Sequence, residues 1–364
     1  MKLLSKLTLF VPALVIFCLL AACSSPKEPL VKNTINWAWM YINRDFSEKN
    51  WETQLSMIKD AGIDGILLLK RSEEPGEYER IARLIKSADL KIHVWIPTVN
   101  PHGAESLETN HPDWYQVNRE GISCLDHPPY IPSYKWLCPN HPEAREYLIA
   151  EMDNLASEDY LDGVHLDYIR FPDVILPIGI QPKYNLVQDH EFPEFDFCYC
   201  EHCREKYKTQ TGVDPMDLED PAANQDWINF RYESINSLVN QIADKVHAHG
   251  KKITAAVFPT PVMSKQMVRQ DWINWKLDAV MPMMYHQYYF EPLSWVETAT
   301  QEGVEALNPN TPLFSGLFIN EIKPGEFDEA VDFAANGGAK GICLFNANGM
   351  SKRQWKALKK AIYK

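Results

Sequence analysis

The sequence alternates short apolar, β-branched runs with amphipathic helical segments along most of its length. Strand-like runs occur at residues 35–41, 63–70, 91–98, 161–168, 252–258, 277–285, 313–318 and 341–346. Helical patterns occur at residues 47–61, 77–88, 142–157, 226–248 and 351–363. Strands that alternate with helices imply parallel strands joined by crossovers. The pattern predicts an α/β fold, a (β/α)8 TIM barrel that forms one domain from residue 34 to residue 364.

Two connections in this pattern are much longer than the others. About 40 residues separate the third strand from its helix, and about 60 separate the fourth strand from its helix. Both loops leave the carboxyl ends of strands, which is the face where barrel active sites lie. Long loops in compact domains usually serve function, so we expect these two to form walls of a binding site.

The fourth strand carries two aspartates, Asp162 at its start and Asp167 at its end. Alternation places His165 and Asp167 on the face that points into the barrel. Five residues of strand separate the two aspartates by about 16 Å, so Asp162 belongs to the bottom of the barrel and Asp167 to the top. Asp64 and Asp278 begin their strands in the same way as Asp162, and a structural role is expected for all three. Asp167 is expected either to be catalytic or to form a salt bridge with Arg170.

Five motifs along the chain carry a family resemblance. They are Cys138-Pro-Asn-His-Pro-Glu-Ala-Arg-Glu-Tyr147, Tyr160-Leu-Asp-Gly-Val-His-Leu-Asp-Tyr-Ile-Arg-Phe-Pro172, His111-Pro-Asp-Trp114, Gln270-Asp-Trp-Ile-Asn-Trp275 and Asp278-Ala-Val-Met-Pro-Met-Met-Tyr285. Together they resemble the glycosyl-hydrolase-like family 10 group of bacterial barrel glycosidases, and the strand-four motif is the most specific of them. The resemblance implies a glycoside hydrolase of oligo- or polysaccharides, with Asp167 as nucleophile or base by analogy of its position in the fold.

A second carboxylate is harder to find, although glycoside cleavage normally needs two. The fifth and sixth strands end without an acid. Glu321, just after the seventh strand, is the best-placed candidate. Asp271, before the sixth strand, and Asp173, after the fourth, follow it.

Polar and aromatic residues at the strand ends are expected to contact the sugar. They are Trp39, Lys70, Asn100, His165, Arg170, Tyr285, His286 and Asn346. The formal net charge of −13 argues against nucleic acid as a partner and suits a neutral glycan. No nucleotide fingerprint and no serine-hydrolase elbow is present, so we expect no cofactor to be required.

The cysteines of the fourth loop leave two interpretations open. Cys198, Cys200 and Cys203 form a C-x-C-x2-C cluster that could hold a structural zinc ion, with His202 or another cysteine as the fourth ligand. Disulfides compete with zinc outside the cytoplasm, and Cys124 and Cys138 lie in one loop where they could form a bridge.

The N-terminus has the pattern of a bacterial lipoprotein signal. Two lysines precede an apolar run that leads to Leu20-Ala-Ala-Cys23. By this resemblance, residues 1–22 form a signal peptide, Cys23 carries palmitate and other acyl chains, and residues 23–33 form a tether. Ser24 after the cysteine favours the outer membrane of the cell envelope. The lipid anchor is the only expected contact with the membrane.

Two other functions remain open from the sequence. A barrel without a second acid suits a catalytically inactive glycan-binding surface lipoprotein. A barrel hydrolase of another bond, such as a peptidoglycan amide, is the other alternative.

Overall fold

The computed structural model describes residues 34–71 and 73–364. Its eight strands are all parallel and follow the order β6-β5-β4-β3-β2-β1-β8-β7. Parallel bridges from Val280 to Leu313 and from Met283 to Gly316 join β6 to β7 and close the barrel. The strands are β1 (Trp37–Met40), β2 (Gly65–Leu69), β3 (Lys91–Pro97), β4 (Gly163–Asp167), β5 (Lys252–Val257), β6 (Ala279–Pro282), β7 (Ser315–Phe318) and β8 (Ile342–Phe345). The predicted (β/α)8 barrel is confirmed, and each predicted strand lies where its apolar run does.

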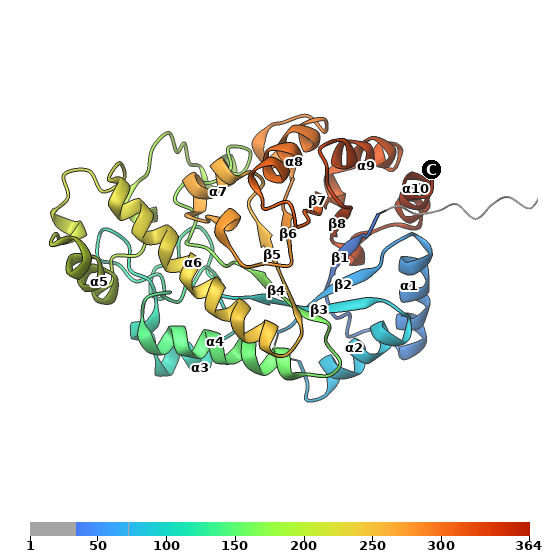
Figure 1. Ribbon diagram of the computed structural model, residues 1–364, viewed down its shortest axis with the longest axis horizontal. Helices are drawn as coiled ribbons and strands as arrows, with labels where there is room; N and C mark the ends of the chain where they lie inside the picture. The colour runs from blue at the N-terminus through green and yellow to red at the C-terminus, as the bar shows by residue number, and fades with distance from the viewer. Residues whose placement is uncertain (1–33, 72) are drawn as a thin grey trace, which may run out of the picture. The chain divides into compact units, whose positions relative to one another are not determined.

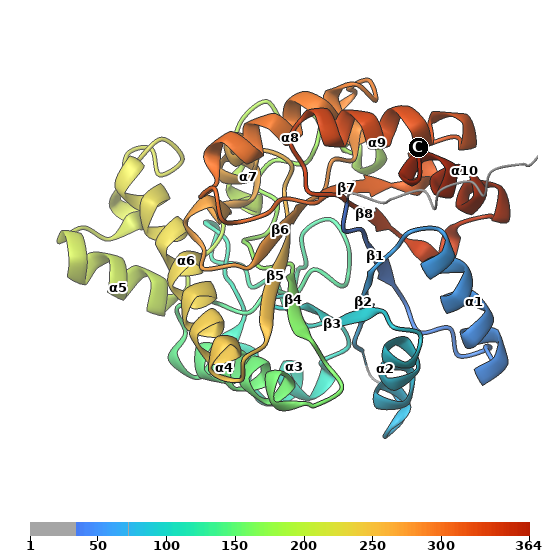
Figure 2. The same ribbon diagram turned by 45° about the vertical axis from the view of Figure 1, so that its right-hand side comes forward.

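Helices surround the strands, as Figures 1 and 2 show. They are α1 (Glu48–Asp60), α2 (Glu77–Ser87), α3 (Glu105–Asn110), α4 (Pro142–Ser157), α5 (Glu201–Thr211), α6 (Gln225–Ala248), α7 (Pro261–Val268), α8 (Trp295–Ala306), α9 (Phe327–Asn336) and α10 (Lys352–Ile362). The five predicted helices are present within one residue at each end. The short helix α3 and the helix α5 lie inside the two long loops, where polar sequences gave no clear helical periodicity.

The strand side chains divide into two apolar groups. One face of each strand packs against the outer helices in the main core, which includes Val164 and Leu166 of β4. The other face fills the barrel with a separate aromatic-rich group that includes Trp37, Trp39 and Trp95. This division is what the alternation of the strand residues requires.

Three aspartates hold the bottom of the barrel by one repeated contact. Asp64 accepts a hydrogen bond from the backbone N–H of Asn36 at 2.7 Å. Asp162 accepts one from Ile92 and Asp278 accepts one from Ile253, both at 2.9 Å. Each aspartate precedes one strand, and its carboxylate binds a backbone N–H at the start of the neighbouring strand, β1, β3 or β5. The regular hydrogen bonds between the two strands begin only beyond this point. The predicted structural role of these aspartates is confirmed.

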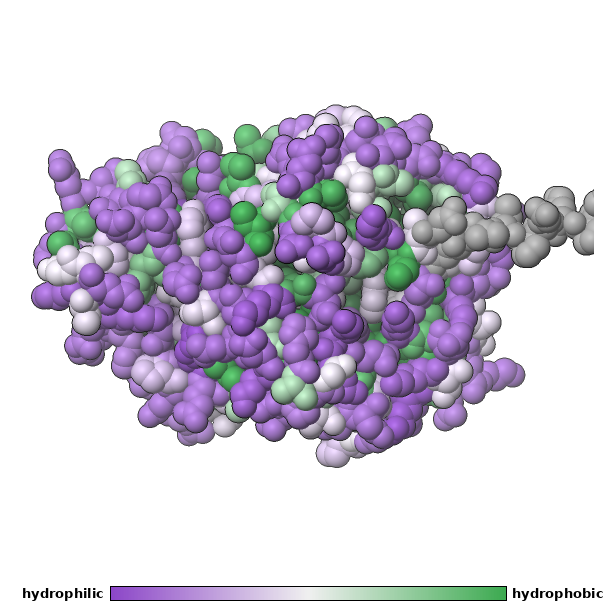
Figure 3. Space-filling view, in the orientation of Figure 1, coloured by the Kyte–Doolittle hydropathy of each residue, from purple (hydrophilic) through white to green (hydrophobic). Residues whose placement is uncertain are grey.

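The predicted signal peptide, Cys23 and tether lie in residues 1–33, outside the described residues. Within the described part of the chain, no helix is long and apolar enough to cross a membrane. The face shown in Figure 3 carries hydrophobic residues in small groups among hydrophilic ones.

Candidate active site

A cavity of about 520 Å³ opens at the carboxyl ends of the strands. Its walls come mainly from the two long loops and from the loop after β6. Eight tyrosines line it, Tyr41, Tyr130, Tyr134, Tyr168, Tyr184, Tyr285, Tyr288 and Tyr289. Trp39, Trp95, Phe258 and Phe345 add further aromatic surface. Flat apolar faces combined with hydroxyl groups suit the faces and hydroxyls of a sugar.

Asp167 lies at the floor of this cavity, at the last position of β4. Its Oδ2 accepts a hydrogen bond from Trp95 Nε1 at 2.8 Å, and its Oδ1 accepts one from the backbone N–H of Tyr168 at 2.7 Å. Burial raises the pKa of Asp167 above its usual value, although both hydrogen bonds and the charge of Arg170 oppose the shift. Tyr168 has a φ of 49°, in the left-handed region that costs a non-glycine residue about 1 kcal/mol. Such strain gathers at functional sites, and here it falls on the residue directly after the carboxylate.

Arg170 forms its ion pair with Asp173 and not with Asp167. Arg170 Nη1 lies 2.8 Å from Asp173 Oδ2, and both side chains are almost fully buried. The guanidinium also lies 4.9 Å from the ring centroid of Trp136. The alternative expectation of a salt bridge between Arg170 and Asp167 is therefore wrong. Among the described residues that line the cavity, Asp167 and Asp173 are the carboxylates, and of the two only Asp173 has a cation as its hydrogen-bond partner.

His165 does not line the cavity, although it points into the barrel as predicted. It is fully buried, and its Nε2 accepts a hydrogen bond from Trp39 Nε1 at 3.0 Å. Its Nδ1 lies 2.9 Å from Thr254 Oγ1. Burial lowers the pKa of His165 well below its usual value, so the ring is neutral. The ring occupies the layer beneath Asp167 and orients Trp39, which itself lines the cavity.

Three of the eight expected sugar contacts, Trp39, Arg170 and Tyr285, line the cavity. The other four do not line the cavity, because their side chains make other contacts: Lys70, Asn100, His286 and Asn346. Lys70 lies over the ring of Tyr78, and Asn346 caps a short helical turn by accepting a hydrogen bond from Gly349. Asn100 is fully buried and its Nδ2 lies 3.2 Å from Nε2 of His102, which does line the cavity.

Glu321 lies in the turn after β7, behind the cavity wall rather than in it. Its carboxylate accepts a hydrogen bond from the backbone N–H of Gln287 at 3.2 Å and lies 3.4 Å from His286 Nδ1. Burial raises the pKa of Glu321 to about 7. Residues 286 and 287 directly precede Tyr288, which lines the cavity. Glu321 therefore contacts the segment that precedes Tyr288 and does not itself line the cavity.

Asp271 is not brought together with Asp167. It is buried, lies 2.9 Å from Lys265 Nζ, and accepts hydrogen bonds from Asn274 and Asn236. These contacts tie the segment before β6 to α6 and α7. These contacts give Asp271 a structural role, and Asp271 does not line the cavity.

The cysteines are arranged differently from the predicted bridge. Every cysteine of the described residues has a free thiol, so the alternative of a disulfide between Cys124 and Cys138 is wrong. Cys138 instead lies beside Cys198, Cys200 and Cys203, and the four sulfurs are within 4.8 Å of one another. Another cysteine was one of the two fourth ligands considered, but about 60 residues separate Cys138 from the cluster, so no local spacing identified it.

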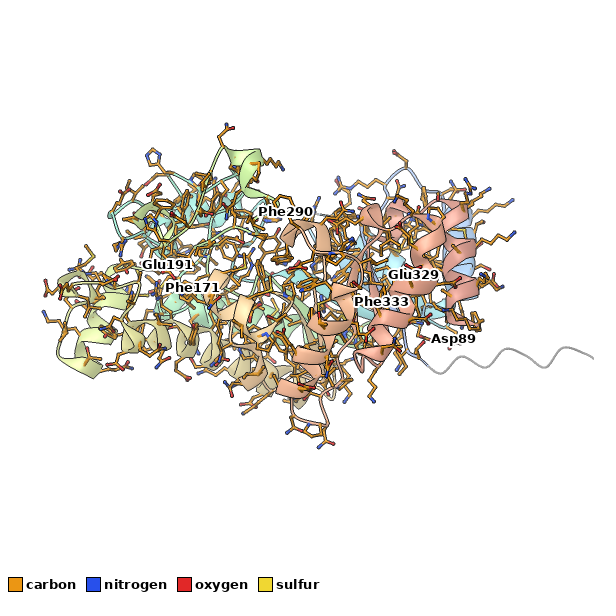
Figure 4. The ribbon with its side chains drawn as sticks, turned by 90° about the horizontal axis from the view of Figure 1, so that it is seen from above. Asp89, Phe171, Glu191, Phe290, Glu329 and Phe333 are labelled. Atoms are coloured by element: carbon orange, nitrogen blue, oxygen red, sulfur yellow. The ribbon has the colours of Figure 1, made fainter. Side chains whose placement is uncertain are left out.

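The loop after β6 supplies cavity residues that the sequence reasoning missed, Tyr288 and Tyr289. It meets the loop after β4 where the N–H of Gly179 donates to the carbonyl of Tyr288 at 2.8 Å. A Cβ at Gly179 would lie 2.5 Å from the carbonyl oxygen of Gln287, so only glycine permits this approach. Figure 4 labels Phe171 and Glu191 from the loop after β4 and Phe290 from the loop after β6. The run of aromatic residues at 285–290 was the available signal in the sequence.

The comparisons with known proteins agree with this architecture. Residues 184–330 match the family model described as glycosyl hydrolase-like 10. The family resemblance is confirmed over this segment. The match includes Glu321 and the cysteines 198, 200 and 203. It begins after Asp167, which therefore lies outside the matched segment. No curated protein matches the sequence.

Two solved structures illustrate the fold. The catalytic domain of a β-amylase from Paenibacillus polymyxa is similar with a TM-score of 0.61 at 13% identity, covering 92% of this chain and 99% of that one. A class V chitinase from Pseudomonas fluorescens is similar with a TM-score of 0.53 at 10% identity, covering 90% and 99%. At these identities the similarity shows the barrel fold alone.

Proposed function

We propose that this protein is a glycoside hydrolase that cleaves an oligo- or polysaccharide at the mouth of the barrel, with Asp167 as nucleophile or general base. The observation that carries the proposal is the setting of Asp167. Its carboxylate lies on the floor of an aromatic cavity and is held by two N–H donors. A carboxylate without a cationic partner keeps its lone pairs available for the anomeric carbon or for a water molecule.

The aromatic walls support a saccharide as substrate. Trp39 and Trp95 form part of the floor around Asp167, and tyrosine hydroxyls surround the opening. Release of new reducing ends from a panel of glycans by the purified protein tests the proposal. Binding without release would favour the inactive glycan-binding alternative, and release of free amines from peptidoglycan would favour amide hydrolysis.

Glu321 is the better proton donor of the two remaining acids near the site. Asp173 is already engaged in a buried ion pair with Arg170 at 2.8 Å, so its carboxylate is not free to face the substrate. Glu321 has a pKa of about 7 and is therefore largely protonated in mildly acidic solution. Because it lies behind Tyr288, this role requires the segment from His286 to Tyr288 to shift when substrate binds.

The pH dependence of hydrolysis tests this role. If Glu321 donates the proton, kcat is expected to fall as pH rises through about 7, because the acid is lost. It should also fall at low pH, where Asp167 becomes protonated. Glu321→Gln is expected to lower kcat at pH 6 by roughly 10²- to 10⁴-fold and to abolish the alkaline limb.

Glu326→Gln serves as the matched control for this substitution. Glu326 lies five residues further on, outside the cavity, and pairs with Lys323. This variant should keep the bell-shaped profile. An unchanged alkaline limb in Glu321→Gln would remove Glu321 from the mechanism.

The proposal includes a lipid anchor at Cys23 in the cell envelope. It rests on the sequence from Leu20 to Cys23. Labelling of cells with a palmitate analogue should mark the wild-type protein and fail to mark Cys23→Ala. Equal labelling of both proteins would contradict the anchor.

A further inference from the structure

Four cysteines from two different loops converge at one place near the start of α5. Cys138 comes from the loop after β3, and Cys198, Cys200 and Cys203 come from the loop after β4. All four are buried, and their Sγ atoms lie within 4.8 Å of one another. Cys138 Sγ is 3.4 Å from Cys200 Sγ and 3.5 Å from Cys203 Sγ. Figure 1 shows α5 beside one end of α6, at a distance from the strands.

These separations fit a metal ion better than disulfide bonds. Bonds of about 2.3 Å from zinc to sulfur place the sulfurs of a tetrahedral site about 3.8 Å apart. A disulfide would bring one pair to about 2.05 Å, and every described cysteine is free. The other two described cysteines, Cys124 and Cys343, are also buried but take no part in the group. Burial of thiols in the core therefore does not by itself explain the convergence.

The surroundings of the four sulfurs suit negative charge. The backbone N–H of Asn140 donates to Cys138 Sγ at 3.4 Å, and its side-chain Nδ2 donates to Cys203 Sγ at 3.3 Å. Lys206 donates to Oδ1 of the same asparagine at 2.8 Å, which brings a cation close to the group. Cys200 is the N-cap residue of α5 and Cys203 lies in its first turn, where the helix dipole favours anions. Hydrogen bonds of this kind orient and tune the thiolate ligands of metal sites.

We propose that Cys138, Cys198, Cys200 and Cys203 bind one zinc ion as four thiolates. Four protein ligands leave no open position, so the ion is structural and takes no part in hydrolysis. Binding replaces the four thiol protons, which are released to solvent. His202, the other ligand considered from the sequence, instead packs its ring against His141 at a centroid distance of 4.2 Å.

The zinc site joins the two loops that build the cavity. The loop after β3 carries Tyr130 and Tyr134, and the loop after β4 carries Tyr168, Arg170 and Tyr184. These two loops meet outside the barrel, where Cys138 lies beside Cys198, Cys200 and Cys203. Zinc would hold the cavity walls in place without touching the substrate. This inference does not depend on the proposed hydrolase activity.

Metal analysis of the purified wild-type protein tests the site directly. We expect one zinc ion per chain, and we expect the four cluster thiols to react with a thiol reagent only when zinc is released. Substitution of zinc by cobalt should give the absorption bands of a tetrahedral cobalt thiolate. These readouts use the folded wild-type protein, so they do not depend on whether a variant folds.

Cys138→Ser and Cys343→Ala form a matched pair of variants. Cys138→Ser should lower the bound zinc from one ion per chain to a small fraction of that, whereas Cys343→Ala should retain it. Mass-spectrometric detection of disulfides among the four cysteines would overturn the proposal. So would metal-replete wild-type protein that contains no zinc, or zinc content unaffected by Cys138→Ser.

Discussion

Asp167→Asn is expected to lower kcat/KM on the responsive glycan by roughly 10³- to 10⁴-fold while the protein stays folded. The amide cannot act as nucleophile or base, and it is nearly the same size as the carboxylate. Both oxygens of Asp167 accept N–H donors, from Trp95 and from the backbone of Tyr168. An amide replaces one acceptor with a donor, so a modest loss of stability, of about 1 kcal/mol, should accompany the loss of activity. Reducing-end assays with both proteins, together with thermal unfolding, measure the two effects.

Asp162→Asn is the matched control, because Asp162 lies five residues earlier, at the bottom of the same strand. Its carboxylate binds the N–H of Ile92 and the side chain of Lys86. We expect a small loss of stability and a kcat/KM close to that of wild type. Equal activity of Asp167→Asn and wild type would remove Asp167 from the chemistry. If activity is lost as expected, the anomeric configuration of the first product separates the two roles: retention identifies a nucleophile and inversion a base.

The contrast between these two aspartates shows what the sequence could predict. Alternation along a strand and the direction of a parallel barrel are local and periodic properties, so they placed Asp162 at the bottom and Asp167 at the top. The same reasoning placed His165 inside the barrel. It did not reveal that Trp39 and Thr254 bind both ring nitrogens, because those residues come from other strands.

The conformations of the two long loops, after β3 and after β4, could not be predicted from the sequence. Their conformation depends on contacts between residues distant in sequence, such as Cys138 with the later cysteines and Gly179 with Tyr288. Loop residues follow no period, so no pattern indicated that Asp173 would pair with Arg170 or that Asp271 would pair with Lys265. Residues just after a strand, such as Lys70 and Asn346, were predicted from position alone, and local contacts decide where such side chains point.

A buried ion pair beside the cysteine group should have a large effect on stability. Asp196 and Arg231 form this pair, and their side chains are 0% and 1% exposed. Tyr199 donates its hydroxyl to the other oxygen of Asp196 at 2.6 Å, and the guanidinium lies 5.1 Å from the ring centroid of Trp227. Asp196→Ala leaves the guanidinium buried without its counter-charge. We expect the free energy of unfolding to fall by about 3–5 kcal/mol. Urea unfolding of variant and wild type, at equal zinc content, measures the difference.

The exposed pair of Lys276 and Asp244 provides the control for this prediction. Their side chains are 57% and 61% exposed, and their charged atoms are 2.9 Å apart. Asp244→Ala should change the free energy of unfolding by no more than about 0.5 kcal/mol, since water solvates both charges. Replacement of both buried partners, as in Asp196→Leu with Arg231→Met, should recover part of the loss, because no charge then remains unpaired in the interior. A loss from Asp196→Ala no larger than that from Asp244→Ala would show that water reaches Arg231 in solution.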